Sequence, residues 1–335
     1  MDKYGYALKQ NNNTDMKNNR SKILISIFIV FIFLSVGCWN IVMRLRTAPL
    51  MEDIYFQAYD NKNLETIIYK YDVQAKTVNE IGRVVGYFHN CKIDSEKNYI
   101  TGVRSPFVPN KDSDFEFGVL RFYLADGTSE LMCSEKQLYI GKDASIVWKY
   151  TFPYDDGNRI CICYKDQDLI YILYDLTTGK AKKIDVSKIE SEVHDIRDNH
   201  IWYSVGNRLM KYNMKTYERK EVLQDATQCT VSDDGKKIAF FENYVKRIYL
   251  YDVEREKKRC ILKAGWNKTF SSYSPYSSGW DKSGNYYYYI ENYVKLFSSS
   301  DTRIKVYNLH TKKSESIYLH RNAPATTIYE FIRNE

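Results

Sequence analysis

Proline and the short signatures of common enzyme families are scarce in this sequence. Only six of its 335 residues are Pro. The G-x-S-x-G turn of serine hydrolases, the phosphate-binding P-loop and the glycine motif of dinucleotide-binding folds are all absent. No two of the five His have metal-binding spacing, and the seven Cys include no C-x-x-C pair. We therefore expect no cofactor and no metal, and we expect most Cys to be small buried residues.

The body of the chain also lacks a strong net charge. The whole sequence has a net charge of +7, but residues 1–50 hold seven Lys and Arg against two Asp. The remaining residues carry 42 basic and 40 acidic side chains. The basic excess therefore belongs mainly to the N-terminal segment and is not the footprint of a nucleic-acid-binding domain. We expect no nucleic-acid partner.

The N-terminal segment contains a long apolar run, Ile23–Met43, with no charged residue over 21 positions. A helix of this length crosses about 30 Å of hydrocarbon. Five Lys and Arg precede the run within residues 1–22, and Arg44 and Arg46 follow it. Because cytoplasmic flanks are enriched in Lys and Arg, we predict a single-pass signal anchor in the cell membrane. Residues 1–22 would be a disordered cytoplasmic tail, 44–52 a linker, and the body extracytoplasmic.

A lipoprotein signal is the alternative interpretation of this run. Leu34–Cys38 (LSVGC) resembles a relaxed lipobox, which would make Cys38 a lipidation site. The bulky Trp39 and the apolar Ile41–Met43 favour the uncleaved anchor, because a mature lipoprotein usually continues with a polar tether. Both interpretations leave the body outside the cytoplasm and attached to the membrane.

The body repeats a short β-rich pattern. The chain has 31 Tyr and is 15% aromatic, a composition that suits pleated, half-buried strands. Six times, a Tyr near the end of an alternating strand precedes a polar turn and a further short strand. These residues are Tyr71, Tyr123, Tyr174, Tyr212, Tyr251 and Tyr307. Their spacings are 52, 51, 38, 39 and 56 residues, and the shorter spacings approach the roughly 40–45 residues of a four-stranded propeller blade.

A second strand lies upstream of most of these Tyr residues. The expected strands are Tyr99–Val103, Ile160–Tyr164, Ile201–Val205, Ile238–Phe241 and Tyr286–Ile290. Turns such as Asp234-Gly235 lead into several of them, which suits hairpins because Gly accepts positive φ. Radial stacking would bury both faces of each sheet. We predict an all-β, six-bladed β-propeller over residues 53–335, with seven blades as the alternative, and expect Thr326–Ile332 to pair into the first blade and close the ring.

One repeat carries a family resemblance. Ser232–Phe240 (SDDGKKIAF) resembles the S-P-D-G-K-x-I-A-F core of the WD40-like repeats in TolB-type β-propellers, with Asp233 in place of Pro. Ile248–Asp252 is similar to the I-Y-V-Y-D strand of that family, and Asp281–Tyr286 is a weaker copy. The resemblance implies a propeller over about residues 53–332 and a bacterial source. It implies little about function, because such propellers serve many tasks.

Two longer spacings provide the candidate binding residues. The insertion 105–117 contains Phe107 and Phe115, and the insertion 269–281 contains Tyr273, Tyr276 and Trp280. Aromatic side chains in exposed loops often contact partners, because they bury a large area at low entropic cost. We expect these five residues on a binding rim of the ring. The alternative is that they fold back over the blades.

These observations predict a membrane-anchored, extracytoplasmic propeller that acts as a binding or scaffolding module of the cell envelope. Its partner would be an envelope protein, a peptide or a glycan. The alternative is an enzyme, for example a carbohydrate-active one, because propeller enzymes gather catalytic groups from several blades. Two or more carboxylates with a His or Arg at the channel mouth would favour the enzyme, and an apolar or aromatic rim would favour the binding module.

Overall fold

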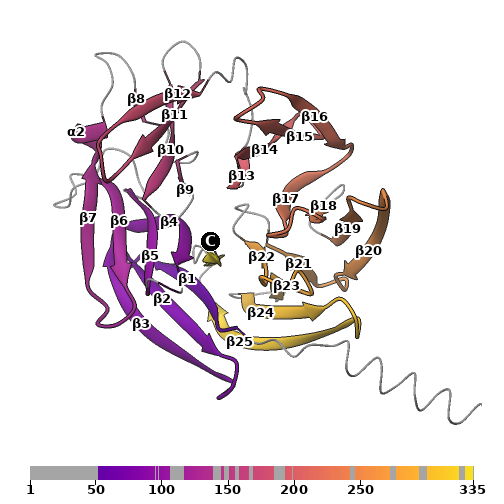
Figure 1. The fold of residues 1–335 in the computed structure, drawn as a ribbon. Helices are drawn as coiled ribbons and strands as arrows, with labels where there is room; N and C mark the ends of the chain where they lie inside the picture. Colours follow the sequence, from indigo (N-terminus) through magenta and orange to yellow (C-terminus); the bar gives the residue numbers. More distant parts are fainter. Residues whose placement is uncertain are drawn as a thin grey trace, which may run out of the picture. The chain divides into compact units, whose positions relative to one another are not determined.

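The computed structural model describes residues 52–334 except 95, 97, 106–116, 139–144, 147–150, 155–157, 166–168, 185–192, 198, 242–245, 272–276, 294–299 and 324–328. These residues belong to a unit that spans Leu50–Glu335. Their strands form six sheets around a common centre (Figure 1). The prediction of an all-β, six-bladed propeller is therefore confirmed, and the seven-bladed alternative is wrong.

The first three blades follow one another along the chain. Blade 1 contains β26 (Tyr329–Phe331), β1 (Ile54–Asp60), β2 (Glu65–Asp72) and β3 (Thr77–Val85). Blade 2 contains β27 (Arg333–Asn334), β4 (Tyr87–Asp94), β5 (Tyr99–Ser105), β6 (Gly118–Tyr123) and β7 (Ser129–Ser134). The short helix α2 (Glu135–Leu138) precedes blade 3, which contains β8 (Ser145–Ile146), β9 (Phe152–Tyr154), β10 (Arg159–Lys165), β11 (Leu169–Asp175) and β12 (Ala181–Ile184).

The other three blades complete the ring. Blade 4 contains β13 (Val193–Arg197), β14 (His200–Val205), β15 (Arg208–Asn213) and β16 (Arg219–Leu223). Blade 5 contains β17 (Thr227–Val231), β18 (Lys237–Phe241), β19 (Arg247–Asp252) and β20 (Lys257–Lys263). Blade 6 contains β21 (Lys268–Phe270), β22 (Ser278–Trp280), β23 (Tyr286–Tyr293), β24 (Ser300–Asn308) and β25 (Lys313–Ala323). The last strand of each blade lies on the outside of the ring (Figure 1).

The repeated Tyr lies at or near the end of the third strand of each blade, and in five blades the Asp or Asn after it caps a turn. In blade 2 the residue after Tyr123 is Leu124. In blade 3, the Asp175 carboxylate accepts hydrogen bonds from the amides of Thr177 (3.0 Å) and Thr178 (2.8 Å). Asp72, Asn213 and Asn308 cap their turns in the same way. Asp and Asn suit this position because their short side chains reach amides two and three residues further on. The Tyr-Asp pattern is thus structural.

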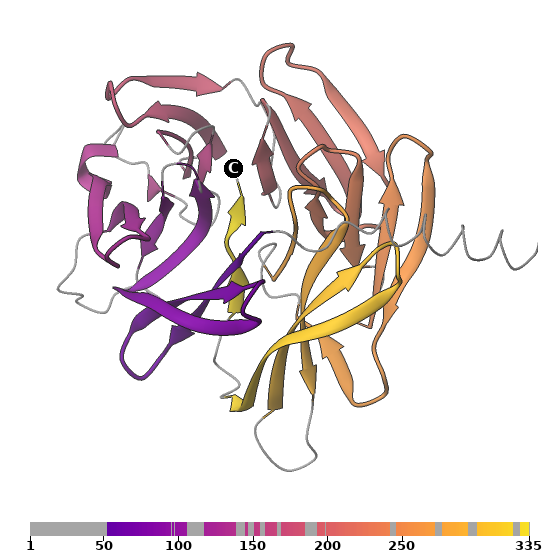
Figure 2. The same ribbon diagram turned by 60° about the horizontal axis from the view of Figure 1, so that its bottom comes forward.

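The C-terminal strands close the ring. β26 pairs antiparallel with β1, with Phe331 opposite Phe56, so the predicted pairing of the C-terminal segment with the first blade is confirmed. The amide of Ile332 then donates to the carbonyl of Tyr55 (3.0 Å). β27 continues into blade 2, where it pairs parallel with β4. The sequence analysis did not predict this second pairing, which ties the C-terminal segment to two neighbouring blades (Figure 2).

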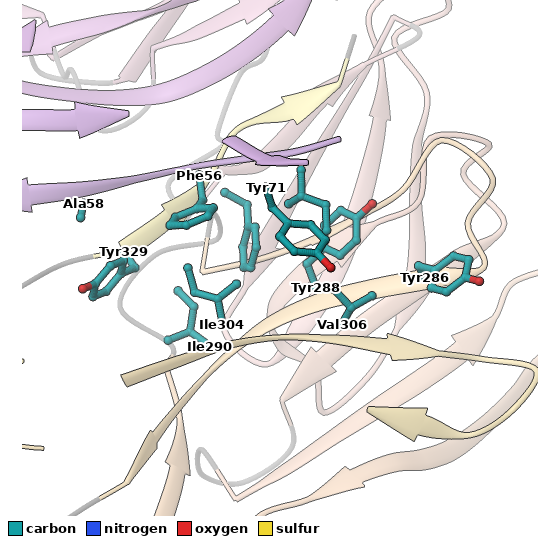
Figure 3. Packing of buried hydrophobic residues seen from close by; sticks show 11 residues of the cluster. Phe56, Ala58, Tyr71, Tyr286, Tyr288, Ile290, Ile304, Val306 and Tyr329 are labelled. Carbon is teal, nitrogen blue, oxygen red and sulfur yellow. The ribbon is translucent and has the colours of Figure 1, made fainter. Parts of the chain in front are cut away.

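Among the described residues, the hydrophobic core is divided into six clusters, and each cluster lies between two neighbouring blades. The side chains of Tyr286–Tyr289 on β23 alternate between the two faces of blade 6. Tyr286 and Tyr288 pack in the cluster shared with blade 1 (Figure 3), whereas Tyr287 and Tyr289 pack in the cluster shared with blade 5. Because every pair of neighbouring blades shares such a cluster, stability comes from blade-to-blade burial.

One face of the ring, which we call the turn face, carries the turns from the first to the second strand and from the third to the fourth strand. A main-chain hydrogen bond joins these two turns in five blades. The bonds are Leu124–Asn98 (3.0 Å), Leu176–Asn158 (2.8 Å), Met214–Asn199 (2.7 Å), Val253–Lys236 (2.9 Å) and Leu309–Asn285 (3.0 Å). In blade 1 the amide of Val73 donates instead to the Asp53 carboxylate (3.1 Å). The chain therefore joins the ring on the turn face.

The opposite face, which we call the loop face, carries the turns between second and third strands and the connections from one blade to the next. Main-chain hydrogen bonds join these two kinds of segment at Gly86–Leu64 (2.8 Å), Ala226–Asn207 (3.0 Å) and Ala264–Lys246 (2.9 Å). β5 ends at Ser105 and β6 begins at Gly118, both on the loop face. At the inner edge of blade 6, β21 and β22 are separate strands that both pair with β23.

The N-terminal predictions fall on residues outside the described part of the chain. Both Ile23–Met43, the predicted anchor, and Cys38, the alternative lipidation site, precede its first residue, Glu52. In the part that is described, no helix is both long enough and apolar enough to span a membrane.

Candidate functional site

The predicted rim residues have different outcomes. Phe107, Phe115, Tyr273 and Tyr276 lie outside the described residues. Trp280 is only 5% exposed: its indole nitrogen donates to the carbonyl of Thr230 (3.0 Å), and its ring packs on Tyr287. This corrects the expectation of an exposed rim residue, because Trp280 is a packing residue between blades 5 and 6.

The inner strands bring polar side chains to the centre of the ring. The strands β26, β22, β17, β13, β9 and β4 pack on one another in that order around it. Lys92 on β4 is 5% exposed, and its ammonium donates to the carbonyl of Ile196 on β13 (2.8 Å). That bond runs from blade 2 to blade 4. The amide of Asn90 also leaves blade 2 and donates to the carbonyl of Thr151 beside β9 (2.7 Å).

Arg197 joins blades 4 and 5 through two carboxylates. Its guanidinium pairs with Asp195 on its own strand (2.7 Å) and with Asp233 in the following blade. Burial opposes the charged guanidinium, but the two carboxylates outweigh that effect, so the pKa of Arg197 is raised. Burial also raises the pKa of Asp233, although Arg197 opposes the rise. The single positive charge of Arg197 neutralises the two carboxylates only in part. Lys92 supplies further positive charge to Asp233.

A second group of carboxylates lies where blade 6 meets blade 1. The Glu52 carboxylate accepts a hydrogen bond from the amide of Lys282, and burial raises the pKa of Glu52. Tyr288 is 5% exposed, and among the described residues its hydroxyl has no hydrogen-bond partner. Burial, together with the charges of Asp281 and Glu52, raises the pKa of Tyr288 well above its usual value. The phenol is therefore protonated at neutral pH.

The junction of blades 1 and 2 contains a third polar group. The buried Glu330 carboxylate on β26 accepts from the hydroxyl of Tyr87 (2.9 Å) and from the amide of Gln57 (3.1 Å). Nearby on β4, His89 shares a hydrogen bond with the hydroxyl of Ser105 (2.9 Å). Burial lowers the pKa of His89 from its usual 6.5 to about 4, so the ring is neutral at physiological pH.

The centre therefore has the composition that the enzyme alternative expects, namely two carboxylates with an Arg. The same side chains, however, hold blades together: Asp195 and Asp233 both engage Arg197. Across the described ranges, no group of three or more His, Cys, Asp or Glu is arranged to hold a metal ion. These ion pairs therefore join blades 4 and 5.

The loop face carries exposed apolar side chains. Trp266, in the connection from blade 5 to blade 6, is 84% exposed. Lys246 fixes this connection, since its ammonium donates to the main-chain carbonyls of Gly265, Trp266 and Lys268. On the same face, Val85 at the end of β3 is 57% exposed and Leu64 in the β1–β2 turn is 47% exposed. An indole held on an anchored loop is well suited to contact a partner.

Comparisons with solved structures identify the architecture. TolB from Acinetobacter baumannii superposes with a TM-score of 0.57 at 11% identity, covering 86% of this chain and 68% of that one. The fold is a TolB-like six-bladed β-propeller. A TolB candidate from Agrobacterium tumefaciens gives a TM-score of 0.54 at 12% identity, with coverage of 83% and 99%. A chain of a nidogen–laminin complex gives 0.52 at 9% identity, with coverage of 84% and 97%.

Comparisons of the amino-acid sequence of this TolB-like propeller identify no further similar protein. No family model matches the chain, and the search of curated proteins finds no match. At identities of 9–12%, the structural likeness establishes the fold alone.

The sequence analysis missed the polar centre. Its signal was present in the inner strands, where charged residues lie next to buried apolar ones: Lys92 stands between Cys91 and Ile93, and Asp195 precedes Ile196. It also missed Trp266, which lies in a short connection and not in either of the two long insertions.

Proposed function

We propose that this protein is a membrane-anchored, extracytoplasmic binding module of the cell envelope, and that its loop face holds a protein partner. The observation that carries the proposal is the exposed Trp266 indole on a connection that Lys246 fixes. Aromatic side chains in such positions contribute strongly to protein interfaces. The uncharged run Ile23–Met43 supports the anchor.

The similar folds are consistent with this kind of function. The nidogen–laminin structure that contains a similar chain is a complex of two proteins. A propeller offers a rigid ring from which loops of several blades reach one partner. For the present chain we propose an envelope protein as that partner, with a peptide or glycan as the other ligand classes for the same face.

Site-specific photocrosslinking in intact cells tests the binding face. A photoreactive amino acid replaces Trp266 in one strain and Val85 in a second strain. In a matched control it replaces Tyr217, which is 56% exposed in the β15–β16 turn of the turn face. We expect both loop-face positions to capture the same protein and position 217 not to capture it. Capture of the same protein from position 217, or no common adduct from 266 and 85, contradicts the proposal.

Membrane attachment is tested separately. We expect the full chain to remain in the membrane fraction after high-salt and alkaline washing, and external protease to digest the body in cells whose envelope has been opened. Release by alkali contradicts the anchor. A body that resists protease until the cytoplasmic membrane is broken contradicts the extracytoplasmic location.

An enzyme with a site at the ring centre is the second candidate, favoured by the pairing of Asp195 and Asp233 with Arg197. It predicts turnover of a glycosidic substrate. Asp233→Asn should abolish this activity, whereas Glu254→Gln in the exposed β19–β20 turn should leave it unchanged. Activity that both variants retain excludes this centre as its source.

A further inference from the structure

The positive charge of the ring is concentrated on the outer strands of four consecutive blades. The segments 176–184, 214–223, 253–263 and 309–321 comprise the outer turns of blades 3 to 6 and all or most of their outer strands. Together they carry 14 Lys and Arg against five Glu. The corresponding segments of blades 1 and 2, 73–85 and 124–134, carry two against three. The body is therefore nearly neutral overall, but its positive charge is concentrated on the outer strands of blades 3 to 6.

The strongest part of this charge lies next to the turn face. Each outer strand of blades 3 to 6 has adjacent cations close to the turn that precedes it. We call these four groups the basic rim: Lys182–Lys183, Arg219–Lys220, Lys257–Arg259 and Lys312–Lys313. All nine side chains are exposed. The outer strands β12, β16, β20 and β25, which carry all of them except Lys312 in the turn before β25, lie along the periphery in Figures 1 and 2.

Several of these cations are not neutralised inside the protein. Among the described residues, no carboxylate lies within ion-pair distance of Lys182, Lys183, Lys220, Lys257 or Lys313. Exposed Lys side chains in such numbers repel one another and favour a multivalent anionic surface.

The chain joins the ring on the same face. Asp53, immediately before β1, accepts from the amide of Val73 and pairs with Lys70 (2.6 Å), which places the start of the ring at the β2–β3 turn. The main-chain hydrogen bonds described above put the outer turns of blades 2 to 6 on that face too. Nine residues, 44–52, separate this point from the apolar run Ile23–Met43. Fully extended, they reach about 30 Å.

We propose that the turn face rests on the membrane and that the basic rim binds the anionic headgroups of its lipids. The point where the chain joins the ring and the basic rim lie toward the same face, and phospholipid headgroups supply a flat array of negative charge. Each Lys or Arg near such a surface strengthens binding by a factor of roughly five at low salt. The docking directs the loop face, with Trp266, away from the bilayer. This inference rests on the membrane anchor of the proposed function.

Lysine labelling of the full chain in lipid nanodiscs tests the docking. Discs of neutral phosphatidylcholine are compared with discs that also contain phosphatidylglycerol, and a soluble amine-reactive reagent labels the protein. We expect labelling of Lys182, Lys257 and Lys313 to fall about fivefold or more in the anionic discs and to recover in high salt. Labelling of Lys62, exposed in the β1–β2 turn of the loop face, should not change.

A matched pair of variants separates the rim from general charge effects. Lys182→Glu with Lys257→Glu should abolish the protection of Lys313, whereas Lys62→Glu with Arg208→Glu on the loop face should preserve it. Equal labelling of the basic rim in both kinds of disc overturns the proposal, and so does equal protection of Lys62. It is also overturned if free polyphosphate protects the basic rim from labelling and anionic discs do not.

The same preparation distinguishes failure of the anchor from failure of the docking. A chain that does not stay with neutral discs lacks the proposed anchor. The rim is then tested by co-sedimentation of the full chain with phosphatidylglycerol vesicles. Salt-sensitive binding that the rim variant loses supports the rim, and absence of binding overturns it.

Discussion

The closing strand offers the sharpest test of the architecture, through the substitution Phe331→Ala. Phe331 is 2% exposed, pairs opposite Phe56 and lies with its ring 5.7 Å from that of Tyr288 in blade 6. Removing a buried Phe side chain costs about 3–5 kcal/mol. Because this side chain belongs to the cluster that joins blades 6 and 1 (Figure 3), the cavity opens at the junction where the ring closes.

Urea unfolding of the full chain in detergent, followed by Trp fluorescence, measures this loss, and calorimetry should show a fall in Tm of roughly 6–15 °C. The matched control is Leu319→Ala on β25, whose side chain is 39% exposed and whose loss should change the free energy of unfolding by about 0.5 kcal/mol or less. A loss below about 1 kcal/mol for Phe331→Ala refutes the view that the C-terminal strand holds the ring closed.

Three further predictions concern buried groups. Because folding lowers the pKa of His89 from 6.5 to about 4, protonation favours the unfolded chain, and about 3 kcal/mol of stability should be lost as the pH falls through that window. Urea unfolding of wild type and His89→Gln across this range measures it. Arg197→Met should cost about 3–5 kcal/mol, since it leaves buried Asp195 without its cation. Gly102→Ala should cost about 1–3 kcal/mol, because a Cβ there would lie 2.5 Å from the sulfur of Cys91.

Each of these predictions has an outcome that contradicts it. A slope of stability against pH that is equal in wild type and His89→Gln would assign the acid sensitivity to other groups. The control for Arg197→Met is Arg208→Ala, which removes the exposed ion pair with Glu221 and should cost less than about 1 kcal/mol. An equal cost for the two substitutions would contradict the argument from the buried pair. A Gly102→Ala protein as stable as wild type would show that Cys91 moves aside freely.

Much of the fold could be predicted from the sequence because the blade repeats a local chemistry. Tyr followed by Asp or Asn marks the end of the third strand in five blades, and the Asp or Asn caps the next turn through its own side chain, as at Asp175. Such signals involve residues two or three positions apart, so they can be read without knowing the tertiary structure. The pairing of the C-terminal segment with blade 1 could be predicted because Thr326–Ile332 has the composition of a strand but belongs to none of the six repeats.

The centre of the ring could not be predicted in this way. Lys92 and Ile196 are 104 residues apart in sequence, and only the arrangement of the blades brings them within hydrogen-bonding distance. Irregularities in the inner strands add to the difficulty. Asn90 and Gln228 adopt positive φ (55° and 50°) where β4 and β17 bulge against their neighbours. Bulges shift which side chains point inward, and alternation patterns do not reveal them.

The loop face was only partly accessible to sequence reasoning. Long insertions attract attention, but exposure depends on how a connection is held. Trp266 stands in a short segment whose conformation depends on three carbonyl contacts from Lys246, twenty positions upstream. Trp280, in contrast, has the composition of a contact residue yet is buried by its neighbour blade.

The main-chain bonds that join the two turns of five blades are compatible with different donor residues. The carbonyl acceptors belong to Asn98, Asn158, Asn199, Lys236 and Asn285, and the donors include Leu, Met and Val, yet the distances stay within 2.7–3.0 Å. The bond leaves the donor side chain free to vary, whereas four of the five acceptors are Asn, and Asn98 and Asn199 adopt the positive φ (61° and 58°) that Asn tolerates. Substitutions at the donor positions can therefore leave these bonds between the two turns of a blade in place.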